Sequence, residues 1–122
     1  MKRDSEALKV RTKDFALRVL RLYRALPRTE EARILGKQLL RSSTSIGANY
    51  RAACRGRSRA EFIAKLGIVL EEADETVFWL ELFQEGNVFP AEKVRDLVRE
   101  ANELVAIFAS SVLTARGFTS AI

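Results

Sequence analysis

The sequence predicts an all-α fold, an antiparallel up-down four-helix bundle, and three observations support this prediction. Apolar residues recur at steps of three and four along most of the chain, which is the period of an α-helix. Only 2 prolines and 6 glycines interrupt the 122 residues, too few for a turn-rich β protein. The breaks leave four segments, of about residues 5–26, 29–53, 58–85 and 90–115, joined by short loops. We expect one domain over residues 1–122, since that length is typical of a single domain.

The first two segments each carry one apolar stripe. The first ends before Pro27, which cannot continue a helix, and its stripe is Leu8, Phe15, Val19, Leu22 and Leu26. The second opens with Glu30 and Glu31, where carboxylates favour the helix dipole. Its stripe is Ala32, Leu35, Leu39, Ser42, Ile46 and Ala53. This stripe keeps its phase through a run of weak helix formers, residues 42–47, so we expect one continuous helix.

The last two segments have clear boundaries. Ser58 and Glu61 have the spacing of a capping box, in which each side chain satisfies a free backbone N–H at the start of a helix. This third segment ends at Gly86, and its core stripe is Phe62, Leu66, Val69, Ala73, Leu80 and Phe83. Pro90 is a favoured first-turn residue and opens the fourth segment, which ends at Gly117. The fourth stripe is Val94, Leu97, Ala101, Val105, Phe108 and Val112.

The composition argues against an enzyme. The chain has no histidine, which excludes histidine-based catalysis and histidine-containing zinc sites. Cys54 is the only cysteine, and without a base it is expected to be a packed apolar residue rather than a nucleophile. No glycine-rich phosphate loop is present. The acidic run at residues 71–75 is expected to be a solvated face or a partner for basic groups, so we expect neither a metal nor another cofactor.

Net charge is distributed unevenly along the chain. Residues 1–70 hold 17 Lys and Arg against 6 Asp and Glu, a net charge of +11, whereas residues 71–122 hold 4 against 10, a net charge of −6. One interpretation is nucleic-acid binding through the basic half. The other is self-association, or pairing of helices within one bundle. No apolar segment is long enough for a signal or a membrane span, which predicts a cytoplasmic protein without a membrane partner.

A cluster of arginines marks the junction of the second and third segments. Its members are Arg51, Arg55, Arg57 and Arg59. Two of them flank the start of a helix, where positive charge is mildly unfavourable, so the cluster needs an anionic partner or an acidic neighbour. Guanidinium groups beside free helix N–H groups form a good phosphate site. The alternatives are a solubilising turn, or pairing with acidic groups of an adjacent subunit.

A second surface feature lies off the core stripe of the third segment. Ile68, Trp79 and Leu82 share one face of this helix by their spacing, with Glu72 and Glu75 beside them. Three large apolar side chains together suggest a buried contact, and we predict that they form an interface between copies of the chain. The alternative is a broader core within one bundle.

One stretch of sequence resembles a known family. Residues 39–53, the basic turn and the start of the third segment are similar to the four-helix bundle proteins of the 23S rRNA-intervening-sequence family. The shared positions are Ser45, Ile46, Ala48, Asn49, Arg57, Ser58, Glu61 and Phe62. The chain departs from the common pattern at residues 50–53, where relatives read isoleucine-alanine-glutamate-glycine, and at residues 71–72, where relatives often have glycine-serine.

The resemblance implies a bacterial cytosolic protein that forms a ring-like homopentamer. Some members are encoded inside insertions of the large-subunit rRNA gene, and a related bundle that accompanies a reverse transcriptase binds nucleic acid and its protein partner. We therefore expect a non-enzymatic oligomeric bundle that binds nucleic acid, with RNA favoured, through the basic surface around the turn between the second and third segments. The alternative is an oligomeric adaptor that binds protein without contacting nucleic acid.

Overall fold

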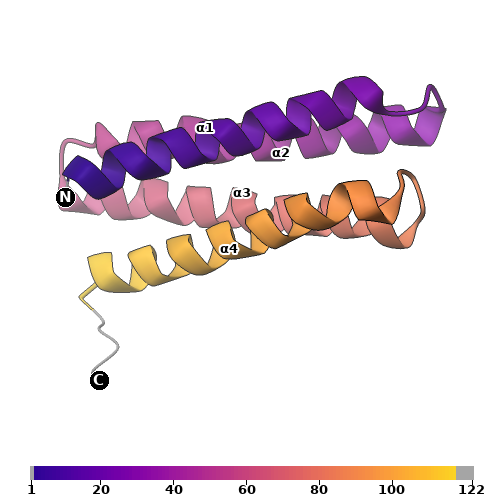
Figure 1. The fold of residues 1–122 in the computed structure, drawn as a ribbon. Helices are drawn as coiled ribbons and strands as arrows, with labels where there is room; N and C mark the ends of the chain where they lie inside the picture. The colour runs from indigo at the N-terminus through magenta and orange to yellow at the C-terminus, as the bar shows by residue number, and fades with distance from the viewer. Residues whose placement is uncertain (1, 118–122) are drawn as a thin grey trace.

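Four long helices make up the computed structural model, which describes residues 2–117 and their side chains from residue 4. They are α1 (Lys2–Ala25), α2 (Glu30–Cys54), α3 (Arg59–Glu85) and α4 (Ala91–Ala115). Successive helices run in opposite directions, with α1 and α2 above α3 and α4 in the view of Figure 1. The predicted four-helix bundle is confirmed, and no strand occurs in residues 2–117.

The helix ends follow local chemistry, with small differences from the predicted bounds. The Thr29 hydroxyl accepts from the Ala32 N–H over 3.2 Å and caps α2. The α2 helix continues through residues 42–47, as its unbroken apolar stripe predicts. Two bounds were predicted wrongly: α1 begins at Lys2 rather than near residue 5, and Pro90 precedes α4 instead of opening it. Pro90 has a ψ of 128°, an extended value, so the helix begins one residue later.

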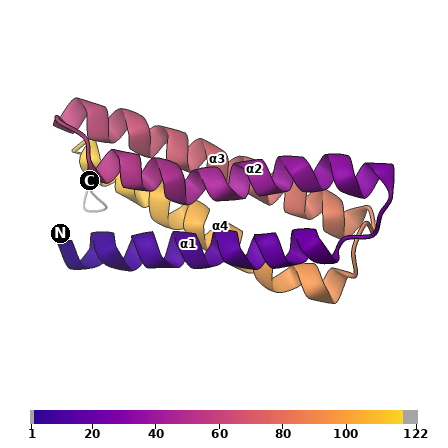
Figure 2. The ribbon, with the colours of Figure 1, turned by 90° about the horizontal axis from the view of Figure 1, so that it is seen from above.

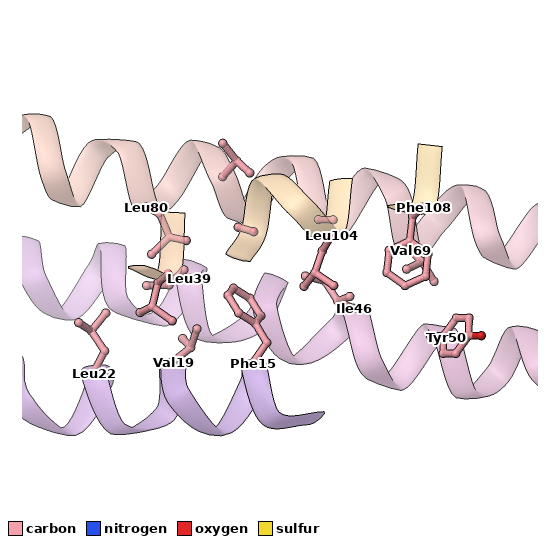
Figure 3. Packing of buried hydrophobic residues seen from close by; sticks show 14 of the residues in the cluster. Phe15, Val19, Leu22, Leu39, Ile46, Tyr50, Val69, Leu80, Leu104 and Phe108 are labelled. Carbon is pink, nitrogen blue, oxygen red and sulfur yellow. The ribbon is translucent and has the colours of Figure 1, made fainter. Parts of the chain in front are cut away.

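The core is a continuous column of apolar side chains from all four helices (Figure 3). Phe15 and Val19 of α1 meet Leu39 and Ile46 of α2 there, and all four are buried. Most of the predicted stripe residues are buried, including Phe83 of α3 and Phe108 of α4.

Five stripe positions are half-buried rather than buried: Leu8, Leu26, Leu35, Phe62 and Val105. On α4 the buried residue is Leu104, and Val105 lies half-buried beside it. The helix period permits either residue at this step, and only the direction of the neighbouring helices decides between them. Phe62 is also half-buried, because it lies in the first turn of α3, at the end of the bundle.

The four helices are not packed equally closely. The α2–α3 and α3–α4 pairs are in contact along most of their length, while α1 and α4 are the least closely packed of the pairs that touch. In Figure 2, α4 crosses beneath α1 and α2 at an angle. The α1 and α3 helices occupy opposite corners of the bundle, with α2 between them, and they make no close backbone contact.

Candidate functional site

The predicted arginine cluster lies at one end of the bundle. This end holds the start of α1, the turn of residues 55–58 between α2 and α3, and the end of α4 (Figure 1). Arg51 belongs to the last turn of α2, Arg55 and Arg57 lie in the turn, and Arg59 opens α3. All four side chains are exposed. The tertiary structure, however, directs them to different neighbours.

The turn itself is held by backbone and side-chain hydrogen bonds. Gly56 donates to the carbonyl of Ala53 over 3.0 Å, and a Cβ at this position would lie 3.0 Å from the same oxygen, so only glycine fits without a shift. The Ser58 hydroxyl accepts from the Glu61 N–H over 3.1 Å, which confirms half of the predicted capping box. The Glu61 carboxylate accepts from the Arg57 N–H at 3.4 Å, one residue before the expected partner. The turn is therefore a defined structure that presents Arg57 to solvent.

Arg59 has a partner within the chain. Its Nε and Nη2 atoms donate to the carbonyl oxygen of Ala115, over 3.0 and 2.5 Å. Ala115 is the last residue of α4, where carbonyl groups are unpaired and the helix dipole is negative. The electrostatic cost of a cation at the start of α3 is thus offset by the end of α4. The Ala115 carbonyl thus gives Arg59 a partner within the chain that is neither an acidic side chain nor an anionic ligand.

Arg51 and Arg55 face α1 across a groove. The groove has a volume of about 530 Å³. We call it the α1–α2 groove, and it is lined by Glu6, Lys9, Val10, Lys13, Asp14, Leu17, Arg51 and Arg55. Four of these residues are basic and two are acidic. Lys9 pairs with Glu6 over 3.1 Å, whereas neither arginine forms an ion pair within the described part of the chain.

Sequence reasoning missed the contribution of α1 to this site. Lys9 and Lys13 are four residues apart, so they share one face of α1. In an antiparallel pair, the start of α1 necessarily lies beside the end of α2. The spacing of the two lysines together with the predicted topology would have placed them opposite Arg51 and Arg55.

A small polar cluster lies at the same end of the bundle, in the last turns of α2. Cys54 is half-buried against the core, and its sulfur lies 3.9 Å from the Ser5 hydroxyl of α1. Burial raises the pKa of Tyr50 to about 12, which keeps its phenol neutral. The Tyr50 ring packs against Phe108 of α4 with centroids 5.4 Å apart. The Ser5–Cys54 contact links the start of α1 to the end of α2, and the Tyr50–Phe108 contact links α2 to α4.

The predicted interface residues do lie on the outer side of α3. Ile68 and Leu82 are exposed, and Trp79 is half-buried against the edge of the core. Phe78 was missed: its side chain is 51% exposed and packs edge-on against Trp79 with centroids 5.1 Å apart. The result is an apolar surface on α3 that the described residues leave uncovered.

An ionic network links this surface to α2. Arg41 pairs with Glu75 and, over 3.4 Å, with Glu72. The Trp79 indole N–H donates to the same Glu75 carboxylate over 2.8 Å, so the ring is held in one orientation. The acidic run of α3 therefore serves partly as a partner for a basic side chain of the same chain, one of the two roles expected for it.

The residues that carry the family resemblance have mainly local roles. Ile46 is buried, and the Asn49 side chain donates to the Ser45 carbonyl over 2.9 Å. Ser58 and Glu61 close the start of α3. Among the described residues, no group of three or more His, Cys, Asp or Glu could hold a metal ion. None of the four helices is long and apolar enough to cross a membrane.

Comparisons with known proteins agree with this architecture. The family described as 23S rRNA-intervening sequence protein matches residues 6–110. A crystal structure of a protein of unknown function from the S23 ribosomal protein family of Bacteroides thetaiotaomicron is similar to the chain, with 38% sequence identity and a TM-score of 0.79. The similarity covers 85% of this chain and 96% of that one. No match was found among curated proteins.

Proposed function

The chain belongs to the 23S rRNA-intervening sequence protein family, and we propose that it is a non-enzymatic, oligomeric bundle that binds nucleic acid, with RNA as the favoured ligand. Neither the family nor the similar structure is described as an enzyme. The proposal includes a bacterial cytoplasmic location and the homopentamer that the family resemblance implies.

The observation that carries the proposal is the convergence of cations from two helices at one end of the bundle. Arg51 and Arg55 come from the end of α2, and Lys9 comes from α1 across the α1–α2 groove. Arg57 adds a fourth cation in the turn. Guanidinium groups bind phosphate oxygens in a bidentate manner, and release of counterions from a nucleic acid favours such binding. The exposed arginines have no ion-pair partner of their own within the described residues.

The contact that Arg59 makes within the chain bears on which arginines we propose for phosphate binding. Arg59 is held by the Ala115 carbonyl, so its guanidinium is oriented along the end of α4. We assign the phosphate contacts to Arg51, Arg55 and Arg57, and a mainly structural role to Arg59. Replacement of Arg59 by Gln should lower stability while changing nucleic-acid affinity less than replacement of any of the other three.

The test measures binding of a labelled single-stranded RNA by fluorescence anisotropy at several salt concentrations. Wild-type affinity should fall steeply with salt, and the triple variant Arg51→Gln, Arg55→Gln, Arg57→Gln should reduce the log–log slope by about 2–3, since each neutralised phosphate contributes about 0.7–0.9. The matched control removes three exposed arginines at the opposite end, by Arg28→Gln, Arg33→Gln and Arg95→Gln. Both triple variants lose the same net charge, so only a localised site distinguishes them.

Two outcomes would contradict the proposal. If the two triple variants weaken binding equally, the slope reports net charge and not a site at this end of the bundle. If the wild type binds neither RNA nor DNA at about 50 mM salt, phosphate contacts are absent and the protein-binding adaptor becomes the better interpretation. The exposed apolar surface of α3 is the observation that favours that second candidate.

A further inference from the structure

Two helix faces at opposite corners of the bundle carry apolar side chains that the described residues leave uncovered. On α1, Val10 and Leu17 are 68% and 41% exposed and lie seven residues apart, on one side of the helix. On α3, Ile68 and Leu82 are each 37% exposed and lie fourteen residues apart, again on one side. The α2 helix lies between α1 and α3, which make no close backbone contact with each other (Figure 2).

The same two helices carry opposite charge. The α1 helix has eight Lys and Arg against three Asp and Glu, a net charge of +5, and α3 has two against seven, a net charge of −5. By helical spacing, Lys13, Asp14 and Arg21 lie beside Leu17, so the α1 face keeps an excess of positive charge. On α3, Lys65 and Glu71 flank Ile68, and Glu75 lies seven residues after it, so this face keeps an excess of negative charge. Within the part of the chain that the structure describes, Lys13, Arg21 and Glu71 form no ion pair.

We propose that the basic, apolar face of α1 in one copy of the chain docks on the acidic, apolar face of α3 in a second copy. The inference rests on the oligomeric part of the proposed function and names the surfaces that make the contact. The α1 face consists of Val10, Lys13, Leu17 and Arg21. The α3 face consists of Ile68, Glu71, Phe78 and Leu82.

Charge decides which faces pair. Contact between two α3 faces would bring carboxylates such as Glu71 of the two copies together, and contact between two α1 faces would do the same with cations such as Lys13. Both arrangements desolvate like charges, whereas contact between an α1 face and an α3 face pairs opposite charges around an apolar centre. Because α1 and α3 occupy opposite corners of the bundle, the two faces of one chain cannot pair with each other. The contact is heterologous, so each copy keeps one free face until a ring closes.

The three arginines assigned to phosphate contacts are not part of the proposed contact between copies. Arg51, Arg55 and Arg57 come from α2 and the turn at the end of the bundle. The α1 face shares Val10, Lys13 and Leu17 with the α1–α2 groove, so a docked copy would lie along the α1 side of the groove, across from Arg51 and Arg55.

The experiment uses two double variants that each disable one face. In Val10→Glu, Leu17→Glu, new carboxylates on α1 oppose the acidic α3 face. In Ile68→Arg, Leu82→Arg, new cations on α3 oppose the basic α1 face. All four positions are exposed, so the helical circular-dichroism signal should persist. Leu113→Glu is the matched control, because Leu113 of α4 is 52% exposed and lies on neither face.

Light scattering should give the wild type and the control a mass several times 13.8 kDa, and each double variant the monomer mass. An equimolar mixture of the two double variants should recover a complex that contains both chains, because each supplies the face that the other lacks. Assembly of the α1 variant alone, or a mixture that remains monomeric, would overturn the heterologous contact. If the wild type is monomeric and still binds RNA with a steep salt dependence, the proposed contact between copies is contradicted and the proposed nucleic-acid site is not.

Discussion

The α2–α3 side of the bundle and the α1–α4 side are built differently. Between α2 and α3, the Thr76 hydroxyl donates to Ser42 Oγ over 2.9 Å, and both side chains are fully buried. Between α1 and α4 the contact depends on Arg11, which donates to Glu100 over 2.7 Å and to Glu103 over 2.8 Å nearer the surface. Hydrogen bonding to Glu100 raises the pKa of Arg11 above its usual value. The α2 and α3 helices are thus tightly packed, whereas α1 and α4 approach each other less closely and add an ionic contact near the surface to the shared apolar core.

The largest expected effect comes from truncating the core on each side. Leu39 of α2 is 1% exposed, and Leu39→Ala should lower the free energy of unfolding by about 2–5 kcal/mol. Leu97 of α4 borders an opening of about 350 Å³ between α1 and α4, where water can replace the lost side chain. Leu97→Ala should therefore lower the free energy of unfolding by less, about 2 kcal/mol. Urea denaturation of the two variants measures the difference, and equal losses would show that the two sides are packed alike.

The buried hydrogen bond between α2 and α3 is the next target. Thr76→Val keeps the shape of the side chain but leaves the Ser42 hydroxyl without its donor, at a cost of about 1–3 kcal/mol. The double variant Ser42→Ala, Thr76→Val should be less destabilised than the sum of the two single variants. Simple additivity in urea denaturation would mean that the two hydroxyls do not depend on each other.

Breaking the ionic contact on the other side should have a smaller and more local effect. Arg11→Met removes a partly exposed cation, so the global loss should be about 1 kcal/mol or less. Because Arg11 joins α1 to α4, hydrogen exchange should accelerate in α1 first and leave the centre of α2 and α3 protected. A uniform acceleration across all four helices would contradict the proposed difference between the two sides.

The smallest effect concerns pH, and it reports on how well α1 covers the bundle. The folded pKa of Tyr50, about 12, exceeds its ordinary value of 10, so the folded state retains the phenol proton more strongly. The corresponding stabilisation is complete below pH 10 and is lost as the pH rises through 12. Tyr50→Phe should lack this loss when unfolding is followed between these pH values. Identical pH profiles for the variant and the wild type would show that the buried phenol makes no contribution.

Much of the fold could be predicted because the signals are local. The apolar period, Pro27 and the cap at Ser58 act within a few residues, and they fix where helices begin and end. The continuity of α2 through residues 42–47 also followed from its stripe. The reason for the small residues there is tertiary, because Ser42 must lie close enough to hydrogen-bond to Thr76 of α3.

The candidate site could be predicted only in part. The arginine cluster was evident from its density in the sequence, and the α3 surface from the spacing of Ile68 and Leu82. Phe78 was missed because it lies at the margin of that face, where spacing alone does not decide exposure.

The sequence by itself determined the four helices, their apolar stripes and the basic character of the turn between α2 and α3, since each depends on neighbours along the chain. The tertiary structure decided which partners the charged side chains meet. It brings Arg59 within hydrogen-bond distance of the Ala115 carbonyl, fifty-six residues away. It also brings Lys9 of α1 to the groove that Arg51 of α2 lines. It also places α1 and α3 on opposite corners of the bundle, so the basic residues of α1 and the acidic residues of α3 do not pair with each other within one chain. These pairings depend on how the helices are arranged around the core, which no local pattern in the sequence specifies.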